Sequence, residues 1–203
     1  RVQQIVEKVL DAHVKKGAVV VMDARSGDIL ALASRPKYHP APGRIEQYLR
    51  GEPGALLDQC VGLFAPGSLF KVVVAAAALA ERIVTPETTF YCRGAKDWPV
   101  RCWSEHGHGV ISFQEAFAQS CNPVFARLAL ELGAANLIAY ARLFGLDDQR
   151  IAGYPVPADP RQNLDLIAAP HNLVNSSLGQ GPVLATPVQI TAMMNTVVNG
   201  GKY

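Results

Sequence analysis

The amino-acid sequence predicts an α+β fold, in which a β-hairpin precedes a mainly helical part. Two short apolar segments, residues 18–22 and 29–33, flank a glycine-containing turn, which is the pattern of a hairpin. After the hairpin, helical periodicity and helix-capping residues mark most of the chain. We therefore expect a helical body and a sheet that remains unfinished within these 203 residues.

Composition restricts the possible classes of function. Of the 203 residues, 49% are hydrophobic and 18% are charged, and the formal net charge is +2. The hydrophobic fraction suits one domain with a sizeable core and argues against extended disorder. A net charge this small does not indicate the basic surface that binds nucleic acid. The longest uninterrupted apolar run, residues 72–80, is less than half of the ~20 residues that cross a bilayer. We expect a soluble chain without a signal peptide, and any membrane anchor would lie upstream of it.

Local chemistry predicts where helices and loops lie. Apolar periodicity, capping boxes and terminal glycines predict helices over residues 2–14, 68–80, 112–120, 122–133 and 186–198. Prolines and glycines make residues 35–58 a long loop with one short helix, and residues 153–160 an extended connector. The segment 68–80 is apolar on every side apart from one lysine, so we expect it to be buried.

Ser68 and Lys71 are the strongest candidates for catalytic chemistry. They lie three residues apart and therefore share one face of a helix. Burial and the positive end of the helix dipole both lower the pKa of a lysine, which favours a neutral amine beside the hydroxyl. Such a pair is a general base next to a nucleophile, and free N–H groups in the first helical turn stabilise an oxyanion. The pattern predicts acyl transfer.

The pattern Ser-x-x-Lys has low specificity by itself, because Ser34 and Lys37 match it as well. Pro36 prevents a continuing helix there and Arg35 keeps that segment hydrated, so the pair on the apolar helix is preferred. For the preferred pair an alternative stays open. Its serine would only cap the helix, and its lysine would extend to the surface.

Further motifs carry a resemblance to a known family. Residues 65–71 (Ala-Pro-Gly-Ser-Leu-Phe-Lys) are followed by Ser120-Cys121-Asn122, which taken alone is also explained as a helix N-cap. Gly179-Gln180-Gly181 and residues 185–189 come next in the same order. Together with the hairpin segment, these blocks resemble a penicillin-binding protein transpeptidase domain. The histidine and glycines that follow Cys102-Trp103 are most similar to the elongation-type, class B members.

The resemblance implies a penicillin-binding/serine β-lactamase-like fold and a peptidoglycan D,D-transpeptidase that β-lactams acylate. Ser68 would attack the penultimate D-Ala carbonyl of a stem peptide, and its backbone N–H would supply half of the oxyanion hole. Lys71 would be the base that activates the serine. Ser120 would relay a proton to the leaving amine, and Asn122 would orient Lys71 and the substrate amide.

Another family motif, Lys-Thr-Gly on a later strand, is missing from the sequence, since Lys202 is followed by Tyr203. The resemblance therefore implies that residues 1–203 are a partial transpeptidase domain that lacks the C-terminal strands. We expect this chain to be inactive, or nearly so, by itself. Within the chain, Gly179, Gln180 and Gly181 are expected to bind substrate.

Cys92, Cys102, His108 and Cys121 have the ligand complement of a tetrahedral structural zinc site. Turn-forming residues between the first two cysteines favour their approach. The spacings are longer than in zinc fingers, and two alternatives stay open: a Cys92–Cys102 disulfide, or reduced buried cysteines. Because Cys121 lies between Ser120 and Asn122, an ion here would tie residues 92–109 to the wall of the active site.

Partners and location follow from the resemblance alone. It implies no cofactor for catalysis, and as partners a stem peptide ending in D-Ala-D-Ala, β-lactams, and a membrane glycosyltransferase in the intact protein. The intact protein would act in cell-wall synthesis and cell shape at the extracytoplasmic (periplasmic) face of the bacterial inner membrane, held by an upstream helix. The alternatives are a serine β-lactamase or carboxypeptidase on the same scaffold, and a non-catalytic β-lactam sensor. We find no dedicated deacylation base, which argues against a β-lactamase.

Overall fold

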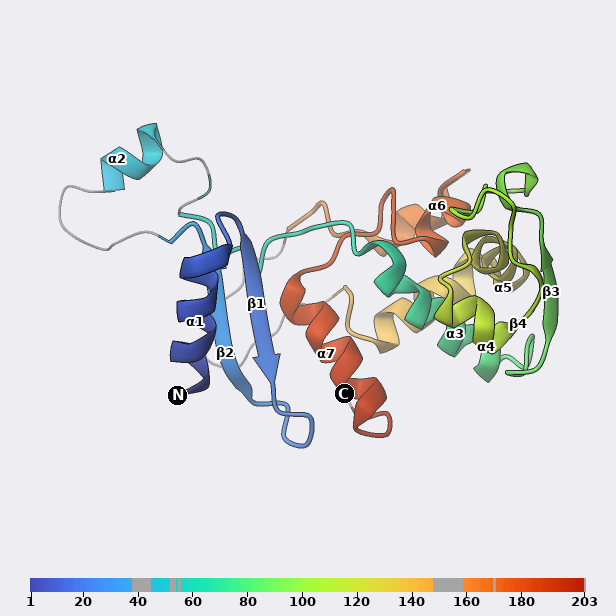
Figure 1. Cartoon of the computed structure of the whole chain (residues 1–203), viewed down its shortest axis with the longest axis horizontal. Coiled ribbons are helices and arrows are strands. Elements are labelled where there is room, and N and C mark those ends of the chain that lie inside the picture. The colour runs from blue at the N-terminus through green and yellow to red at the C-terminus, as the bar shows by residue number, and fades with distance from the viewer. Residues whose placement is uncertain (38–44, 52–53, 55, 148–158, 170, 203) are drawn as a thin grey trace. The chain divides into compact units, whose positions relative to one another are not determined.

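A computed structural model describes residues 1–37, 45–51, 54, 56–147, 159–169 and 171–202 (Figure 1). The described residues form two compact units. The first comprises the residues up to Phe64 together with those from Ala185 onward, and the second comprises the described residues between Ala65 and Leu184. Helices and short antiparallel strands occur in the chain together, which confirms the α+β prediction.

The first unit is built on the predicted hairpin. Strand β1 (Gly17–Met22) pairs antiparallel with β2 (Ile29–Arg35), with Gly17 opposite Arg35 and an irregularity between Val21 and Met22. In the turn, the Asp23 carboxylate accepts hydrogen bonds from the backbone N–H groups of the second and third residues after it. Such local bonds are the reason that aspartate favours turns.

Two helices cover the hairpin. Helix α1 (Val2–His13) packs along β2, and α7 (Pro187–Val198) packs along β1 (Figure 1). The Gln3 side chain donates to the Leu32 carbonyl at 2.9 Å and accepts from the Leu32 N–H at 2.8 Å. It therefore satisfies both backbone polar groups of Leu32. Thr186 forms the capping box that the sequence predicts. The short helix expected between residues 35 and 58 is α2 (Ile45–Arg50).

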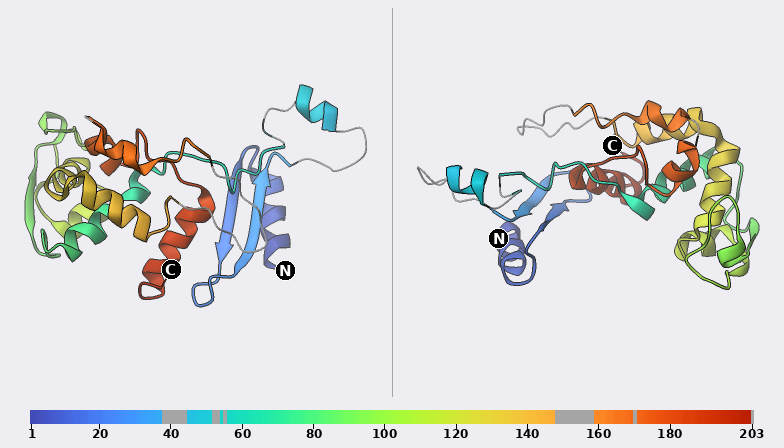
Figure 2. Two further views of the ribbon diagram at one scale, coloured as in Figure 1. Left: turned by 180° about the vertical axis from the view of Figure 1, so that it is seen from behind. Right: turned by 90° about the horizontal axis from the view of Figure 1, so that it is seen from above.

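Helix α5 (Asn122–Leu143) is the centre of the second unit (Figure 2). Around it pack α3 (Lys71–Ala80), α6 (Asn172–Ser177) and the 3₁₀ turn η3 (Leu164–Ala168). Most of α3 is buried, as its uniform apolar composition predicts. A 3₁₀ turn, η1 (Gly67–Phe70), leads into α3.

Gly133 interrupts α5. Its φ of 75° and ψ of 160° lie outside the helical region, so the predicted helix end is present there. After Gly133 the helix resumes and continues to Leu143, and the sequence analysis did not predict this continuation. In length and apolar composition α5 could cross a membrane, but half of its most apolar stretch is buried inside the unit, as in the core helix of a globular protein.

A second hairpin was not predicted. Strand β3 (Thr89–Cys92) pairs with β4 (Gly109–Ser112), and the residues between them form an excursion that includes the 3₁₀ turn η2 (Gly94–Lys96). Four-residue strands separated by such a long segment carry too little periodicity to be recognised. Helix α4 (Phe113–Ala118) then begins at the predicted capping box of Ser112. The connector predicted over residues 153–160 lies almost wholly outside the described residues.

Candidate active site

Ser68 lies on η1, at the entrance to the buried helix α3, and it is exposed to solvent. The preceding residue, Gly67, has a φ of 59° and donates its N–H to the Gly179 carbonyl at 2.9 Å. Within the described part of the chain, the Ser68 N–H has no hydrogen-bond partner. Ser68 therefore offers a reachable hydroxyl next to a free backbone donor.

Lys71 is buried, with 2% of its surface exposed. Its Nζ donates to three acceptors: the Ser120 carbonyl at 2.8 Å, Ser120 Oγ at 2.9 Å and Asn122 Oδ1 at 2.6 Å. The Phe125 ring centroid lies 5.3 Å from the same nitrogen. This burial is the one expected from the sequence, and the alternative in which Lys71 extends to the surface is wrong.

Burial lowers the pKa of Lys71 to about 8, opposed by the nearby Cys121 and Cys102 thiols, which raise it. Water solvates an ammonium far better than a protein interior does, so the neutral amine gains stability when the side chain is desolvated. With a pKa of about 8, about a tenth of the lysine is neutral at pH 7. The neutral amine is therefore populated near neutral pH.

Ser120 links the lysine to the nucleophile. Its Oγ lies 3.0 Å from Ser68 Oγ, and its backbone φ of 51° is left-handed, which is rare for a residue with a side chain. This conformation presents the Ser120 carbonyl and hydroxyl to Lys71 together. The one-turn spacing of Ser68 and Lys71 suggests direct contact, but among the described residues no hydrogen bond joins them, and Ser120 bridges the two.

Asn122 is the first residue of α5, and its side chain bonds Lys71 rather than the helix end. The N-cap position is occupied by Cys121, without a side-chain capping bond. The alternative that Asn122 merely caps a helix is therefore wrong. Phe125 was missed by the sequence analysis, although its position three residues after Asn122 places it on the same helical face.

Gly179, Gln180 and Gly181 lie beside the entrance to α3. Gly179 is buried with a φ of 65°, and a Cβ atom there would lie 2.0 Å from the Gly67 carbonyl oxygen. Only glycine allows this close approach of two backbone segments. Gln180 and Gly181 are exposed. This segment therefore packs, through Gly179, against Gly67, the residue before Ser68.

The four predicted zinc ligands come together. One donor atom from each of Cys92, Cys102, His108 and Cys121 lies within 4.8 Å of the others, and the three thiols are buried. His108 Nε2 is buried without a hydrogen-bond partner in the described structure. All four cysteines of the chain are free, so the alternative Cys92–Cys102 disulfide is not formed. Three thiols and one imidazole match the donor set of a tetrahedral zinc ion, and His108 Nδ1 lies 3.5 Å from Cys102 Sγ.

The cluster connects the excursion between β3 and β4 to the Ser120 segment. Cys121 comes from that segment, Cys92 is the last residue of β3, and Cys102 and His108 come from the excursion. Trp103 adds a second connection, since its indole N–H donates to the Gln119 carbonyl at 2.9 Å and its ring meets the His108 ring edge-on. In the absence of a cation, burial raises the pKa of the Cys121 thiol to about 12.

Comparisons with known proteins agree with this geometry. Residues 17–203 match the family described as penicillin binding protein transpeptidase domain. The chain is 34% identical to the peptidoglycan D,D-transpeptidase PbpA of Mycolicibacterium smegmatis, over 92% of this chain and 41% of that protein. This chain belongs to the penicillin-binding protein transpeptidase family, as the resemblance in its sequence indicated.

Solved structures support the same assignment. PBP2 of Pseudomonas aeruginosa in complex with WCK 5153 superposes with a TM-score of 0.85 at 28% identity, over 98% of this chain and 48% of that one. Penicillin-binding protein A of M. tuberculosis, as its ceftriaxone acyl-enzyme complex, gives 0.77 at 30% identity, over 92% and 45%. The chain thus spans less than half the length of each of these three proteins.

Proposed function

We propose that the intact protein containing this chain is a class B, elongation-type peptidoglycan D,D-transpeptidase that works through an acyl-serine. The observation that carries this proposal is the hydrogen-bonded chain from Ser68 Oγ through Ser120 Oγ to the buried Lys71 amine. Membership of the transpeptidase family and the printed activity of the Mycolicibacterium relative support it. Acyl transfer by these residues requires no cofactor.

In the first half of the reaction, Ser68 Oγ attacks the penultimate D-Ala carbonyl of a stem peptide. The serine proton moves through Ser120 to the neutral amine of Lys71, and the Ser68 N–H stabilises the oxyanion. When the C–N bond breaks, the proton returns through Ser120 to the leaving D-Ala. Asn122 keeps the Lys71 amine oriented throughout, since it holds one of its three bonds.

In the second half, the amine of a neighbouring stem peptide attacks the acyl-serine. Lys71 again accepts a proton through Ser120, and Ser68 regains it when the ester breaks, so the enzyme returns unchanged. We propose that the other half of the oxyanion hole comes from a Lys-Thr-Gly strand outside residues 1–203, which would form only part of the domain.

Labelling with a fluorescent penicillin tests the nucleophile. The intact protein is expected to be labelled at Ser68, and the Ser68→Ala variant not at all, because the hydroxyl forms the covalent bond. Ser34→Ala is the matched control, since Ser34 belongs to the second Ser-x-x-Lys pattern and should leave labelling unchanged. Labelling of Ser68→Ala would refute the assignment. Labelling of residues 1–203 alone would refute only the partial-domain proposal.

Product analysis separates the alternative functions. A transpeptidase joins two stem peptides, a carboxypeptidase releases D-Ala without joining them, and a β-lactamase hydrolyses its penicillin adduct rapidly. A sensor is acylated and turns over no peptide. We expect crosslinked peptide and a long-lived penicilloyl-Ser68 from the intact protein. Rapid loss of the label, or D-Ala release with no crosslinked product, would contradict the proposal.

Gly179→Ala is expected to slow acylation of Ser68 by at least about tenfold. Its Cβ would meet the Gly67 backbone at 2.0 Å, so the residue before the nucleophile must move, and displacements of about 1 Å in a catalytic group are costly. The measurement is the rate of penicillin acylation. Gly27→Ala is the control, because Gly27 also has a positive φ but has nothing within 4 Å of an added Cβ. Equal effects of both variants would refute the steric explanation.

We also propose that Gly179, Gln180 and Gly181 line the substrate path beside Ser68. Support comes from their packing against Gly67, which brings the exposed Gln180 near the entrance to α3. The partners we infer are a stem peptide ending in D-Ala-D-Ala, β-lactams, and a membrane glycosyltransferase that supplies the glycan strand. We place the intact protein at the periplasmic face of the inner membrane, anchored by an upstream helix.

Zinc is the metal that we propose for Cys92, Cys102, His108 and Cys121. Support comes from the clustering of the four donors, which include three buried thiols. The ion would act structurally, by fixing the excursion to the segment that carries Ser120. Purified protein should contain about one zinc per chain, because structural zinc binds with roughly 10 kcal/mol or more. Less than about 0.2 zinc per chain would favour free thiols instead.

A further inference from the structure

Ser120 lies just past the end of helix α4, at a position that glycine usually occupies. Its N–H donates to the Phe117 carbonyl at 3.0 Å, and the Cys121 N–H donates to the Ala116 carbonyl at 2.9 Å. These two bonds form a Schellman motif, in which the residue after the helix end has a left-handed backbone. The φ of 51° at Ser120 costs free energy, because this residue has a Cβ atom. Neighbouring contacts must therefore hold Ser120 in this conformation.

The conformation of Ser120 is set by the orientations of the two rigid peptide planes beside it. The plane after Ser120 is held on both sides, because its carbonyl accepts a bond from Lys71 Nζ at 2.8 Å and its N–H, from Cys121, belongs to the motif. The plane before Ser120 combines the Ser120 N–H with the Gln119 carbonyl. Among the described residues, the one hydrogen bond to the Gln119 carbonyl comes from Trp103 Nε1, at 2.9 Å.

The orientation of the plane before Ser120 affects the path of the proton. Ser120 Oγ lies 3.0 Å from Ser68 Oγ and 2.9 Å from Lys71 Nζ. If this plane rotates, the hydroxyl moves relative to these two groups. Proton transfer requires both separations to stay within hydrogen-bond reach, so the bond to the Gln119 carbonyl bears on the reaction.

Trp103 is an exposed residue whose side chain is nevertheless oriented. Its surface is 63% exposed, so burial of the ring contributes less than it does for a core tryptophan. The ring meets the His108 ring edge-on, with centroids 5.3 Å apart and an interplanar angle of 68°. The indole N–H is the polar group of this side chain, and it is directed at the Gln119 carbonyl.

The backbone that carries Trp103 is itself fixed inside the excursion. The Cys102 N–H donates to the Gly94 carbonyl at 3.1 Å. A Cβ at Gly94 would lie 2.2 Å from the Glu105 carbonyl oxygen, so the chain on both sides of Trp103 packs closely against the same glycine. The indole therefore extends from a firm support toward the Ser120 segment.

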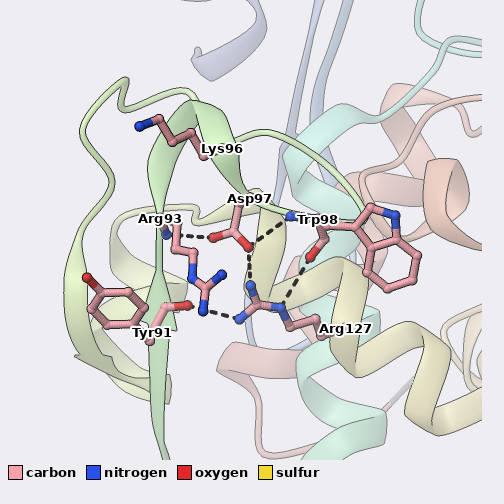
Figure 3. A pocket seen from close by; sticks show the side chains of 6 residues that line it. All are labelled: Tyr91, Arg93, Lys96, Asp97, Trp98 and Arg127. Carbon is pink, nitrogen blue, oxygen red and sulfur yellow. Dashed lines mark hydrogen bonds and ion pairs between the residues drawn. The ribbon is translucent and has the colours of Figure 1, made fainter.

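The other tryptophan of the chain, Trp98, provides a comparison within the same excursion. It is 74% exposed and lies at a pocket of about 360 Å³ (Figure 3). Its backbone N–H donates to Asp97 and its carbonyl accepts a bond from Arg127, which ties the excursion to α5. In the described part of the chain, the Trp98 indole nitrogen has no hydrogen-bond partner, so its side chain holds no element of the active site.

We propose that Trp103 is a positioning residue for acyl transfer, which acts on Ser120 through the Gln119 carbonyl. Its indole N–H holds the peptide plane before Ser120 and so keeps the Ser120 hydroxyl between Ser68 and Lys71. The excursion thereby supports the proton path through a side chain that is not among the proposed zinc ligands. This inference rests on the proposed transpeptidase function.

Trp103→Phe in the intact protein tests this role, because phenylalanine keeps an aromatic ring and lacks the N–H donor. At saturating fluorescent penicillin, we expect the first-order rate constant for Ser68 acylation to fall by at least about tenfold. The dissociation constant of the non-covalent penicillin complex should change by less than about twofold, since the indole positions a proton carrier. Trp98→Phe is the matched control and should acylate at the normal rate. Trp103→benzothienylalanine, in which sulfur replaces the N–H, should be as slow as Trp103→Phe.

A double-mutant cycle shows whether Trp103 acts through Ser120. Once Ser120→Ala has removed the hydroxyl, Trp103→Phe should lower the acylation rate constant by less than about a further twofold, because no proton carrier is left to position. A general loosening of the domain would instead give the same factor in both backgrounds.

Three results would overturn the inference: equal rates for Trp103→Phe and Trp98→Phe, a normal rate for Trp103→benzothienylalanine, or an undiminished effect of Trp103→Phe in the Ser120→Ala background. Failure of penicillin to label Ser68 in the unaltered protein is a different result. It would overturn the proposed function together with this inference.

Discussion

Lys71→Met is expected to lower the rate of Ser68 acylation by about a thousandfold, within the range measured for the loss of a general base. Methionine approximates the length of the lysine side chain and keeps its packing, so the expected loss reports on the amine. Among the described residues, Lys71 Nζ is the only group besides Ser68 Oγ that hydrogen-bonds Ser120 Oγ, so it alone can take the serine proton through Ser120.

The measurement is the second-order rate constant for a fluorescent penicillin, with Lys37→Met as the control. Lys37 completes the other Ser-x-x-Lys pattern, and its Nζ pairs with Asp11 at 2.9 Å on the surface. Exposed ion pairs contribute about 0–1 kcal/mol, so the control should acylate at the normal rate. Retention of more than about a tenth of the normal rate by Lys71→Met would show that another group is the base.

The pH dependence provides an independent check on the same lysine. Because burial lowers its pKa to about 8, the neutral and active form increases as pH rises through that value. Acylation should therefore accelerate with pH and reach a plateau above about pH 9, while Lys71→Met should lose this step. A rate in the unaltered protein that is flat between about pH 6.5 and 9.5 would contradict the assignment.

Removal of the proposed zinc ion is expected to destabilise the domain by at least about 3 kcal/mol, which corresponds to a fall in Tm of roughly 6–12 °C. The excursion between β3 and β4 has few other connections to the active-site wall, chiefly the bond from Trp103 to the Gln119 carbonyl and the pairing of Asp97 with Arg127. Thermal unfolding with and without a chelator measures this effect.

Cys102→Ser and Cys60→Ser form a matched pair of variants. Both cysteines are buried and free, but only Cys102 belongs to the four-residue cluster. Cys102→Ser should lose zinc, show the lowered Tm, and acylate more slowly because Ser120 adjoins another ligand of the cluster. Cys60→Ser should retain its zinc. A chelator that leaves Tm and acylation unchanged in a zinc-containing protein would argue against the structural role.

Features of the fold that depend on neighbouring residues were predictable. The capping boxes at Ser112 and Thr186 begin helices as expected, and Gly133 ends one. These features depend on bonds between residues three or four apart, which a sequence displays directly. The β3–β4 hairpin was missed, because the partners Thr89 and Ser112 are far apart in the chain and each strand is short.

The candidate site shows the same division. Burial of Lys71 was predictable, because a helix that is apolar on every side has no polar face to turn toward water. The bond from the Trp103 indole to the Gln119 carbonyl was not recognised, since it joins residues that are 16 positions apart in the chain. Sequence spacing also could not show that Ser120 lies between Ser68 and Lys71.

By itself, the sequence determined the family, the buried lysine one turn beyond a serine, and the set of residues suited to zinc, because each depends on residue type and short-range spacing. The tertiary structure decided which of these residues meet. It brought Ser120 and Asn122 to Lys71 and gathered three thiols and an imidazole within 4.8 Å of one another. The physical reason is that such contacts join segments distant along the chain, whose approach is governed by the packing of whole helices.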